Sequence, residues 1–272
     1  MTGTAETARK GEKEQHIFRQ TWTWKDTWGL IFIVVAIGLM GLRPIQSRLI
    51  SWLITLGLLG LFAVVAGRGV TGCFLGLLVD ERNKMSLSRL QMILWTLLVL
   101  SGWVSAALWN VVCGADNPLA IAIPQELWLL MGISTTSLVG SPLILNTRKN
   151  KPAESGEVSD SLKKLRVDRD KIENVGLVVE NKQMADAQLA DLFRGEEVTN
   201  ADKLDLAKIQ MLYFTLMLVL VYAVTLGHMF ARIDCAITTF PALNTSVVAL
   251  LGISHAGYLT SKALPRSLTP RQ

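Results

Sequence analysis

The sequence predicts an all-α fold, a bundle of six transmembrane helices in which a unit of two helices occurs twice. The first observation behind this prediction is the spacing of charge in a chain of 272 residues, 50% hydrophobic and only 18% charged. Four long stretches contain no charged residue, at 90–115, 127–147, 209–231 and 235–261. Each is long enough for an apolar helix across a hydrocarbon core of ~30 Å, which needs about 20 residues. This pattern excludes a soluble globular enzyme and a disordered or collagen-like chain.

Two further apolar stretches precede these four, and the polar sequence Arg43–Arg48 separates them. Two arginines at the centre of a bilayer would be costly, and Pro44 disfavours one continuous helix. We therefore expect a hairpin with a short polar turn. The six predicted spans are residues 28–42, 49–67, 90–109, 127–145, 209–230 and 245–261.

The distribution of Lys and Arg predicts the orientation of the spans. Of the 27 Lys and Arg residues, 24 fall in segments that share one side of the membrane, and only Arg43, Arg48 and Arg232 fall on the other. Both termini are therefore expected in the cytoplasm. The net charge of +5 follows from this topology, so it does not indicate a nucleic-acid partner. The partners that we expect are the lipid bilayer and further copies of this chain.

The spans and loops divide the chain into seven segments. These are a cytoplasmic N-terminal segment (1–27), a transmembrane hairpin (28–67), an interfacial or re-entrant segment (68–89), a first repeat (90–145), a cytoplasmic helical linker (146–207), a second repeat (208–264) and a C-terminal tail (265–272). The apolar stretch 69–79 is too short to span a bilayer. It could lie in the interface, re-enter the membrane, or continue the second span as a bent helix.

The second observation is an internal repeat with a period of about 120 residues. Residues 86–92 match residues 205–211, and residues 130–134 match residues 250–254. Because each unit contains two spans, both copies face the same way, unlike the inverted repeats of many transporters. We expect Ser86 or Ser88 to cap the first helix of the unit, and Ser88 could form a capping box with Gln91.

Polar residues inside the spans are the candidate functional residues, and they are Gln91, Ser134, Ser137, Gln210, Ser254 and His255. The two glutamines begin equivalent helices and could form interhelical hydrogen bonds or contact an ion or substrate. The serines share one helix face in each copy. That face could serve close packing, or it could line a pore at the repeat axis or the oligomer axis.

His255 is the only histidine predicted deep in the membrane, about 10 Å along the helix from Lys262. An ionisable residue at that depth indicates a functional role. The alternative is a neutral imidazole that donates a hydrogen bond to a neighbouring helix. The sequence has no zinc-ligand spacing, no Gly-rich phosphate loop and no nucleophile elbow, so we expect no enzyme, no metal site and no cofactor.

Residues 146–207 form the only sizeable part predicted outside the membrane. Their apolar residues from Leu162 to Phe193 give a loose helical pattern after a cap at Ser159 or Asp160. The adjacent acids Glu196 and Glu197 could attract a divalent cation, although two neighbouring acids are usually solvated.

Three groups of residues carry a family resemblance. They are Leu78-Val79-Asp80-Glu81-Arg82-Asn83 and Ser86-Leu87-Ser88-Arg89-Leu90-Gln91 with Trp95-Thr96, then Asp191-Leu192-Phe193-Arg194-Gly195-Glu196-Glu197 and Gln210-Met211 with Phe214-Thr215, and then Gly252-Ile253-Ser254-His255-Ala256-Gly257-Tyr258-Leu259. With them the chain resembles, over roughly residues 70–264, a family of bacterial polytopic membrane proteins without an assigned function. The resemblance implies a bacterial inner membrane, and it implies no catalytic residues and no known substrate.

Cys113 and Cys235 fall in equivalent outer loops of the two repeats. These loops could meet near a pseudo-twofold axis, and the outer side of a bacterial inner membrane permits a disulfide. The alternative is two free, partly buried thiols.

Three functions are consistent with these features. A homo-oligomeric ion channel or pore, gated through residues 146–207, is favoured by the parallel repeat, the small polar helix face and spans without buried acid–base pairs. A membrane-anchored scaffold or sensor would instead use residues 146–207 to recruit a cytoplasmic protein partner. A secondary transporter is disfavoured because the spans contain no Asp, Glu, Lys or Arg.

Overall fold

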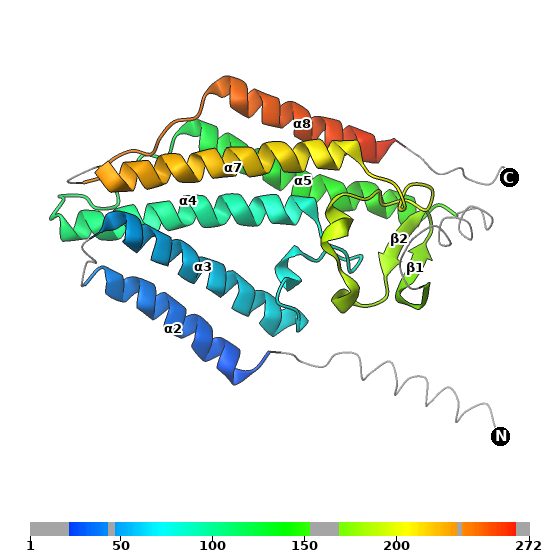
Figure 1. Ribbon diagram of the computed structural model, residues 1–272, viewed down its shortest axis with the longest axis horizontal. Helices are drawn as coiled ribbons and strands as arrows, with labels where there is room; N and C mark the ends of the chain where they lie inside the picture. Colours follow the sequence, from blue (N-terminus) through cyan, green and yellow to red (C-terminus); the bar gives the residue numbers. More distant parts are fainter. Residues whose placement is uncertain (1–21, 43–46, 153–168, 233–235, 265–272) are drawn as a thin grey trace.

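The computed structural model describes residues 22–42, 47–152, 169–232 and 236–264. Its six long helices are α2 (Trp24–Met40), α3 (Arg48–Thr71), α4 (Leu87–Val112), α5 (Gln125–Lys149), α7 (Leu206–Arg232) and α8 (Thr245–Ala263), shown in Figure 1. Each coincides with one predicted span, with boundaries that differ by four residues or fewer. The polar turn between the first two spans falls mainly on residues 43–46, outside the described residues.

Among the described helices, α3, α4, α5 and α7 are long and apolar enough to cross a membrane. Helix α2 is shorter, with 17 residues, and α8 contains Ser, Thr, His and Lys side chains. The helices also turn large apolar side chains outward, such as Phe32, Val224 and Ile253, which are 65–71% exposed. Contiguous apolar surface of this kind is rare on soluble proteins and is expected where lipid covers it. The chain is therefore an integral membrane protein.

The two helix pairs run the same way through the bundle (Figure 1). Helix α4 packs against α7, where the rings of Trp95 and Tyr222 lie 6.1 Å apart. Helix α5 packs against α8, and both run opposite to α4 and α7. Helix α3 lies against α4 and α7, with Trp52 stacked on Phe230, and α2 packs on α3. The superposition of the two pairs by rotation about the membrane normal stays a prediction.

A small unit that contains two strands and short 3-10 turns covers one end of the bundle. It contains β1 (Ile172–Val175), β2 (Val178–Asn181) and the short 3-10 turns η2 (Arg169–Lys171), η3 (Met184–Asp186) and η4 (Leu189–Leu192). We name residues 169–205 the cap. The cap lies where α4 and α7 begin and where α5 and α8 end (Figure 1).

The strands of the cap correct two sequence predictions. The fold is mostly helical, as expected, but it includes one two-stranded sheet, and the helical pattern expected between Leu162 and Phe193 is wrong where the structure describes it. The antiparallel strands β1 and β2 place Val175 opposite Val178, with Gly176 between them at φ +59. β-branched residues on both sides of that glycine favour a tight hairpin. The expected helix cap at Ser159 or Asp160 lies outside the described residues.

The stretch 69–79 extends α3 only as far as Thr71. The helix ends at Gly72, and the 3-10 turn η1 (Gly76–Leu78) folds back against α3. Of the three alternatives, continuation of the second span therefore holds for its first residues only. Helix α4 then begins after the N-cap Ser86, whose side chain makes no capping hydrogen bond. The capping box expected at Ser88 is wrong, because Gln91 turns into the bundle instead.

At the opposite end of the bundle, the loops after α4 and α7 meet, as the sequence predicted. Asn110 accepts a hydrogen bond from the Ile237 backbone N–H at 2.7 Å and donates to the Ile237 carbonyl at 2.8 Å. The Ala122 N–H donates to the Thr238 carbonyl at 2.8 Å. Cys113 caps the end of α4, but Cys235 lies outside the described residues, so the disulfide stays a prediction.

Asn110 is expected to stabilise this junction measurably. Asn110→Ala removes both hydrogen bonds and leaves the buried Ile237 backbone without its partner, so the free energy of unfolding should fall by about 2 kcal/mol. Denaturant unfolding in detergent micelles measures the change. The control is Asn117→Ala, in an exposed position of the same loop. Equal stability of the two variants would contradict the role of Asn110.

Candidate functional site: a buried polar column beneath a charged cluster

Four helices each contribute one polar side chain to a junction in the bundle core. His255 of α8 is buried, and its Nδ1 lies 2.6 Å from Ser137 Oγ of α5. Its Nε2 lies 3.1 Å from Gln91 Nε2 of α4, which also donates to Thr215 Oγ1 of α7. With this orientation of the Gln91 amide, His255 Nε2 accepts a hydrogen bond from Gln91, and His255 Nδ1–H donates one to Ser137 Oγ. The arrangement places the His255 imidazole between α4 and α5, within hydrogen-bond distance of both helices.

Three of the six candidate residues, Gln91, Ser137 and His255, meet at this junction, and Ser134 and Ser254 lie buried on the same two helices, α5 and α8. Gln91, Ser134, Ser137, Ser254 and His255 are all buried. We name these residues, with Thr215, the polar column. Gln210 does not join them, because α7 turns Met211 into the core and leaves Gln210 exposed. The two glutamines of the repeat therefore occupy different environments.

Several polar atoms of the column have no partner. Gln91 Oε1, Ser134 Oγ and Ser254 Oγ are buried without a hydrogen-bond partner among the described residues, as is Trp95 Nε1 one turn beyond Gln91. Buried polar atoms are nearly always hydrogen-bonded, often to ordered water. Close packing through small residues would account for the serines, but not for the amide oxygen and the indole N–H. Ordered water commonly supplies the missing partner of such atoms.

One turn closer to the cap, two hydroxyl side chains meet a charged one, that of Lys262. Tyr258 of α8 and Ser141 of α5 lie 3.3 Å apart through their hydroxyl oxygens. Lys262 donates to both hydroxyls, at 2.7 Å to that of Tyr258. The same ammonium forms an ion pair with Glu196 of the cap at 2.7 Å. A path of polar contacts thus joins this end of the bundle to the cap.

Glu196 is the centre of the charges. Its Oε1 lies 3.1 Å from Arg82 Nη2 and 3.1 Å from Lys208 Nζ, while Oε2 contacts Lys262. Arg82 also contacts Asp80 at 2.6 Å. We name these five residues the charged cluster. All except Asp80 are less than 8% exposed as side chains.

Electrostatics keep this carboxylate ionised. Burial alone would raise the pKa of Glu196, but Arg82, Lys208 and Lys262 together hold that pKa well below its usual range. Burial would likewise lower the pKa of the Arg82 guanidinium, but Glu196 and Asp80 raise it above its usual value. Each charge in the cluster therefore depends on the others to remain charged in a buried place.

The backbone of the cap fixes Glu196 in this position. The Glu196 carbonyl accepts from the Val179 N–H of β2 at 3.0 Å, and the Val198 N–H donates to the Leu177 carbonyl at 2.9 Å. Gly195 permits the turn before Glu196, because an added Cβ would lie 2.3 Å from the Asn200 side chain.

A second connection places Arg82 beside the cap. Asn83 and Asn181 each donate through the side-chain amide to the other's backbone carbonyl, both at 2.8 Å. The loop that carries Arg82 is thereby held against the end of β2.

No pattern in the sequence predicts this cluster. Glu196 and Glu197 were expected to be solvated, but both are buried, and Glu197 pairs with Arg148 at 3.6 Å. Nor does Glu196 suit a divalent cation, since three cationic side chains surround it. The sequence indicates Arg82, Lys208 and Lys262 as cations near the ends of spans, and no pattern in it connects them with Glu196. One signal for it was available in the sequence. Two adjacent acids precede a span, and the Lys and Arg residues of the chain gather at the ends of spans.

Comparisons with protein-family models, with curated proteins and with solved structures gave no match to this chain. The family resemblance of the three motifs therefore stays a prediction.

Glu196→Gln should destabilise the protein strongly. The neutral amide leaves three buried cations without their shared carboxylate, and breaking a buried ion pair typically costs about 3–5 kcal/mol. Denaturant unfolding in micelles measures the loss. The matched control is Glu173→Gln, at an exposed position of β1. A loss no larger than that of the control would show that the cluster does not hold the cap.

Lys84 gives the cap a distinct pH dependence. Burial, together with Arg82 and Lys208, lowers the pKa of Lys84 from 10.5 to about 8. Protonated Lys84 therefore costs stability below pH 8, and that cost disappears as the pH rises from 8 towards 10.5, where the unfolded chain binds more protons. Unfolding measured from pH 7 to 10.5 should show wild type gaining about 3 kcal/mol relative to Lys84→Met. The exposed Lys182→Met is the control, and parallel pH profiles for wild type and Lys84→Met would refute the shift.

Proposed function

We propose that the protein is an ion channel that conducts protons through the polar column, with the cap as its gate. The observation that carries the proposal is His255, held among polar side chains of four helices beside buried atoms that lack partners. We propose further that all six long helices span a bacterial inner membrane, with both termini in the cytoplasm. The cap then lies on the cytoplasmic side.

Protons suit this column better than larger ions. Imidazole and hydroxyl groups both donate and accept hydrogen bonds, so they can relay a proton along with water. The contacts around His255 measure 2.6 Å and 3.1 Å, which is hydrogen-bond distance. The column contains no carboxylate that would bind a metal cation.

The path in this proposal lies inside one copy of the chain. The polar residues face one another between the α4–α5 and α7–α8 pairs, which favours a pore at the repeat axis over one at an oligomer axis. Further copies would meet through outward apolar faces of the helices. A homo-oligomer remains part of the proposal, but conduction does not require it.

The charged cluster supplies the gate. Glu196 belongs to the cap, whereas Lys208 and Lys262 belong to α7 and α8. Lys262 also contacts Ser141 and Tyr258, the polar residues nearest the column. Opening the path at this end requires the cap to give up ion pairs that are costly to break singly. The conformation described is accordingly the closed one.

A second function, a scaffold or sensor, is favoured by exposed apolar residues at the cap and the start of α7. Leu189, Leu204 and Leu206 are 62–77% exposed. Exposed apolar clusters commonly mark interaction sites, here for a cytoplasmic protein partner. This function needs no path through the bundle, so transport measurements separate the two.

His255 decides between them. Protein reconstituted in liposomes with a trapped pH dye should acidify the lumen under an imposed potential, and His255→Gln should lower the proton flux at least about tenfold. The control is His228→Gln, at an exposed position on α7. Unfolding of both variants in micelles checks that the fold is retained. Wild-type flux equal to that of empty liposomes, or unchanged flux in His255→Gln, would contradict conduction through the column.

A further inference from the structure

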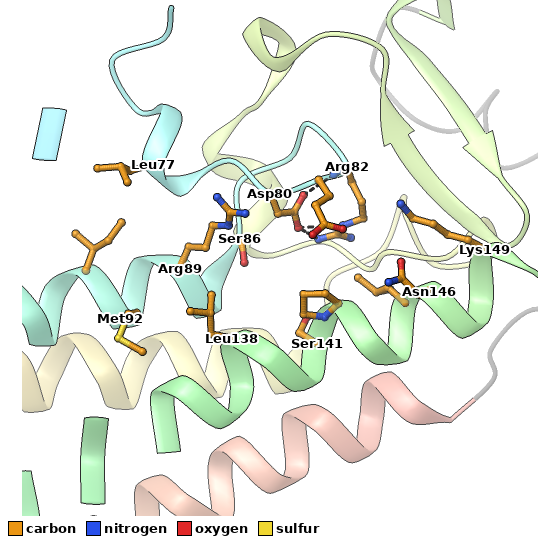
Figure 2. Close-up of a pocket in the computed structure, with 14 residues that line it drawn as sticks. Leu77, Asp80, Arg82, Ser86, Arg89, Met92, Leu138, Ser141, Asn146 and Lys149 are labelled. Carbon is orange, nitrogen blue, oxygen red and sulfur yellow. Dashed lines mark hydrogen bonds and ion pairs between the residues drawn. The ribbon is translucent and has the colours of Figure 1, made fainter. Parts of the chain in front are cut away.

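A cavity of about 360 Å³ opens between α4, α5 and the segment that joins α3 to α4 (Figure 2). It lies outside the polar column. One wall is apolar and includes Leu77, Met92 and Leu138. The other wall is polar and includes Arg82, Ser86 and Arg89. A cavity with one apolar and one cationic wall fits an amphiphile better than it fits a wholly polar solute.

Two arginines at the polar wall have donors without acceptors among the described residues. Arg89, half-buried in the first turn of α4, makes no ion pair or hydrogen bond with the described residues. Arg82 is only 4% exposed, and its Nη1 has no hydrogen-bond partner there either, although Nε and Nη2 hold Asp80. The Ser86 hydroxyl does not cap α4. Leaving a buried charged donor unpaired is costly, so the wall is built for an acceptor.

The charge of the wall selects an anion. Its cationic residues are Arg82, Arg89 and Lys149, against the acidic Asp80 and Glu81, and Lys149 is already paired with Glu180 at 2.7 Å. Arg82 pairs with Asp80 at 2.6 Å, so the cation of this wall that pairs with no described acid is Arg89. The N-terminus of the 26-residue helix α4 adds a partial positive charge beside Ser86 and Arg89. Arginine in particular matches the oxygen pairs of a phosphate group.

We propose that this cavity binds an anionic membrane phospholipid, with the phosphate at Arg82, Ser86 and Arg89 and an acyl chain along the apolar wall. The cavity lies at the start of α4, where apolar helices meet the cap, so a lipid can enter it from the bilayer (Figure 2). Basic pockets between transmembrane helices on the cytoplasmic side are typical sites for anionic headgroups. A soluble phosphate would satisfy the donors but leave the apolar wall uncovered.

The site also reaches the charged cluster. Arg82 faces the cavity and contacts Glu196 at 3.1 Å through Nη2. A bound phosphate therefore shares its guanidinium with the residue that holds the cap. That coupling, which rests on the proposed function, makes the lipid a regulator of the gate. Lipid binding itself does not depend on conduction.

Lipid titration with native mass spectrometry tests the site on the full chain in detergent. Wild type should bind phosphatidylglycerol in preference to phosphatidylcholine. Arg89→Gln should weaken phosphatidylglycerol binding at least about tenfold, the effect of one charge-assisted hydrogen bond, and leave phosphatidylcholine binding unchanged. Because Arg89 has no partner among the described residues, this change should not disturb the fold. Arg232→Gln, exposed at the end of α7, is the matched control and should bind like wild type.

Three results would overturn the proposal. These are equal affinity of wild type for the two lipids, equal phosphatidylglycerol affinity of wild type and Arg89→Gln, and inorganic phosphate that displaces the lipid at comparable concentration. The last result would identify a site for a free anion. All three readouts measure binding alone, so they are independent of whether the liposomes show proton flux.

Discussion

The ion pairs of one buried carboxylate organise this molecule. Glu196 forms ion pairs with Arg82 in the loop before α4, with Lys208 at the start of α7 and with Lys262 at the end of α8. Four charged groups in a buried place are tolerable only together, because each alone would face a large desolvation cost. Segments far apart in the sequence are thereby held in one arrangement. The cap stays on the bundle for this reason, and the cluster ends beside the polar column.

The lipid environment imposes a second constraint, which sorts side chains by face. Helices in hydrocarbon must turn polar groups inward, where they find partners on neighbouring helices. His255 meets polar residues of two other helices in this way, while Ile253, two residues earlier, is largely exposed. A polar core that is only partly paired is the expected cost of a path through the bundle. The same sorting gives the lipid cavity one apolar and one cationic wall.

The helices were predictable because membrane spans depend on local composition. Charge-free stretches and the polar residues at their ends place the six helices within four residues. Five of the six candidate polar residues were found by their depth in the spans. Gln210 was not placed well, because identity within a repeat does not fix which way a helix faces. Met211, its neighbour, occupies the core position instead.

The charged cluster and the hairpin were not predictable for physical reasons. No periodicity connects residues 82, 196, 208 and 262, since tertiary contacts alone bring them together. Two adjacent acids in a charged loop look solvated until their partners are known. Strands of four residues are too short for a period of two to stand out from a helical pattern. The charged cluster and the hairpin both form where the cap meets the bundle, so short-range sequence patterns do not predict them.

A double-mutant cycle between Glu196 and Lys262 tests the central claim most directly. The free energies of unfolding of Glu196→Gln, Lys262→Met and the double variant are compared with that of wild type in the same detergent. If Glu196 holds the cap through its ion pairs, Lys262→Met should lower the free energy of unfolding far less in the Glu196→Gln background than in wild type, with a coupling energy of about 2 kcal/mol or more. Strictly additive losses would contradict the account.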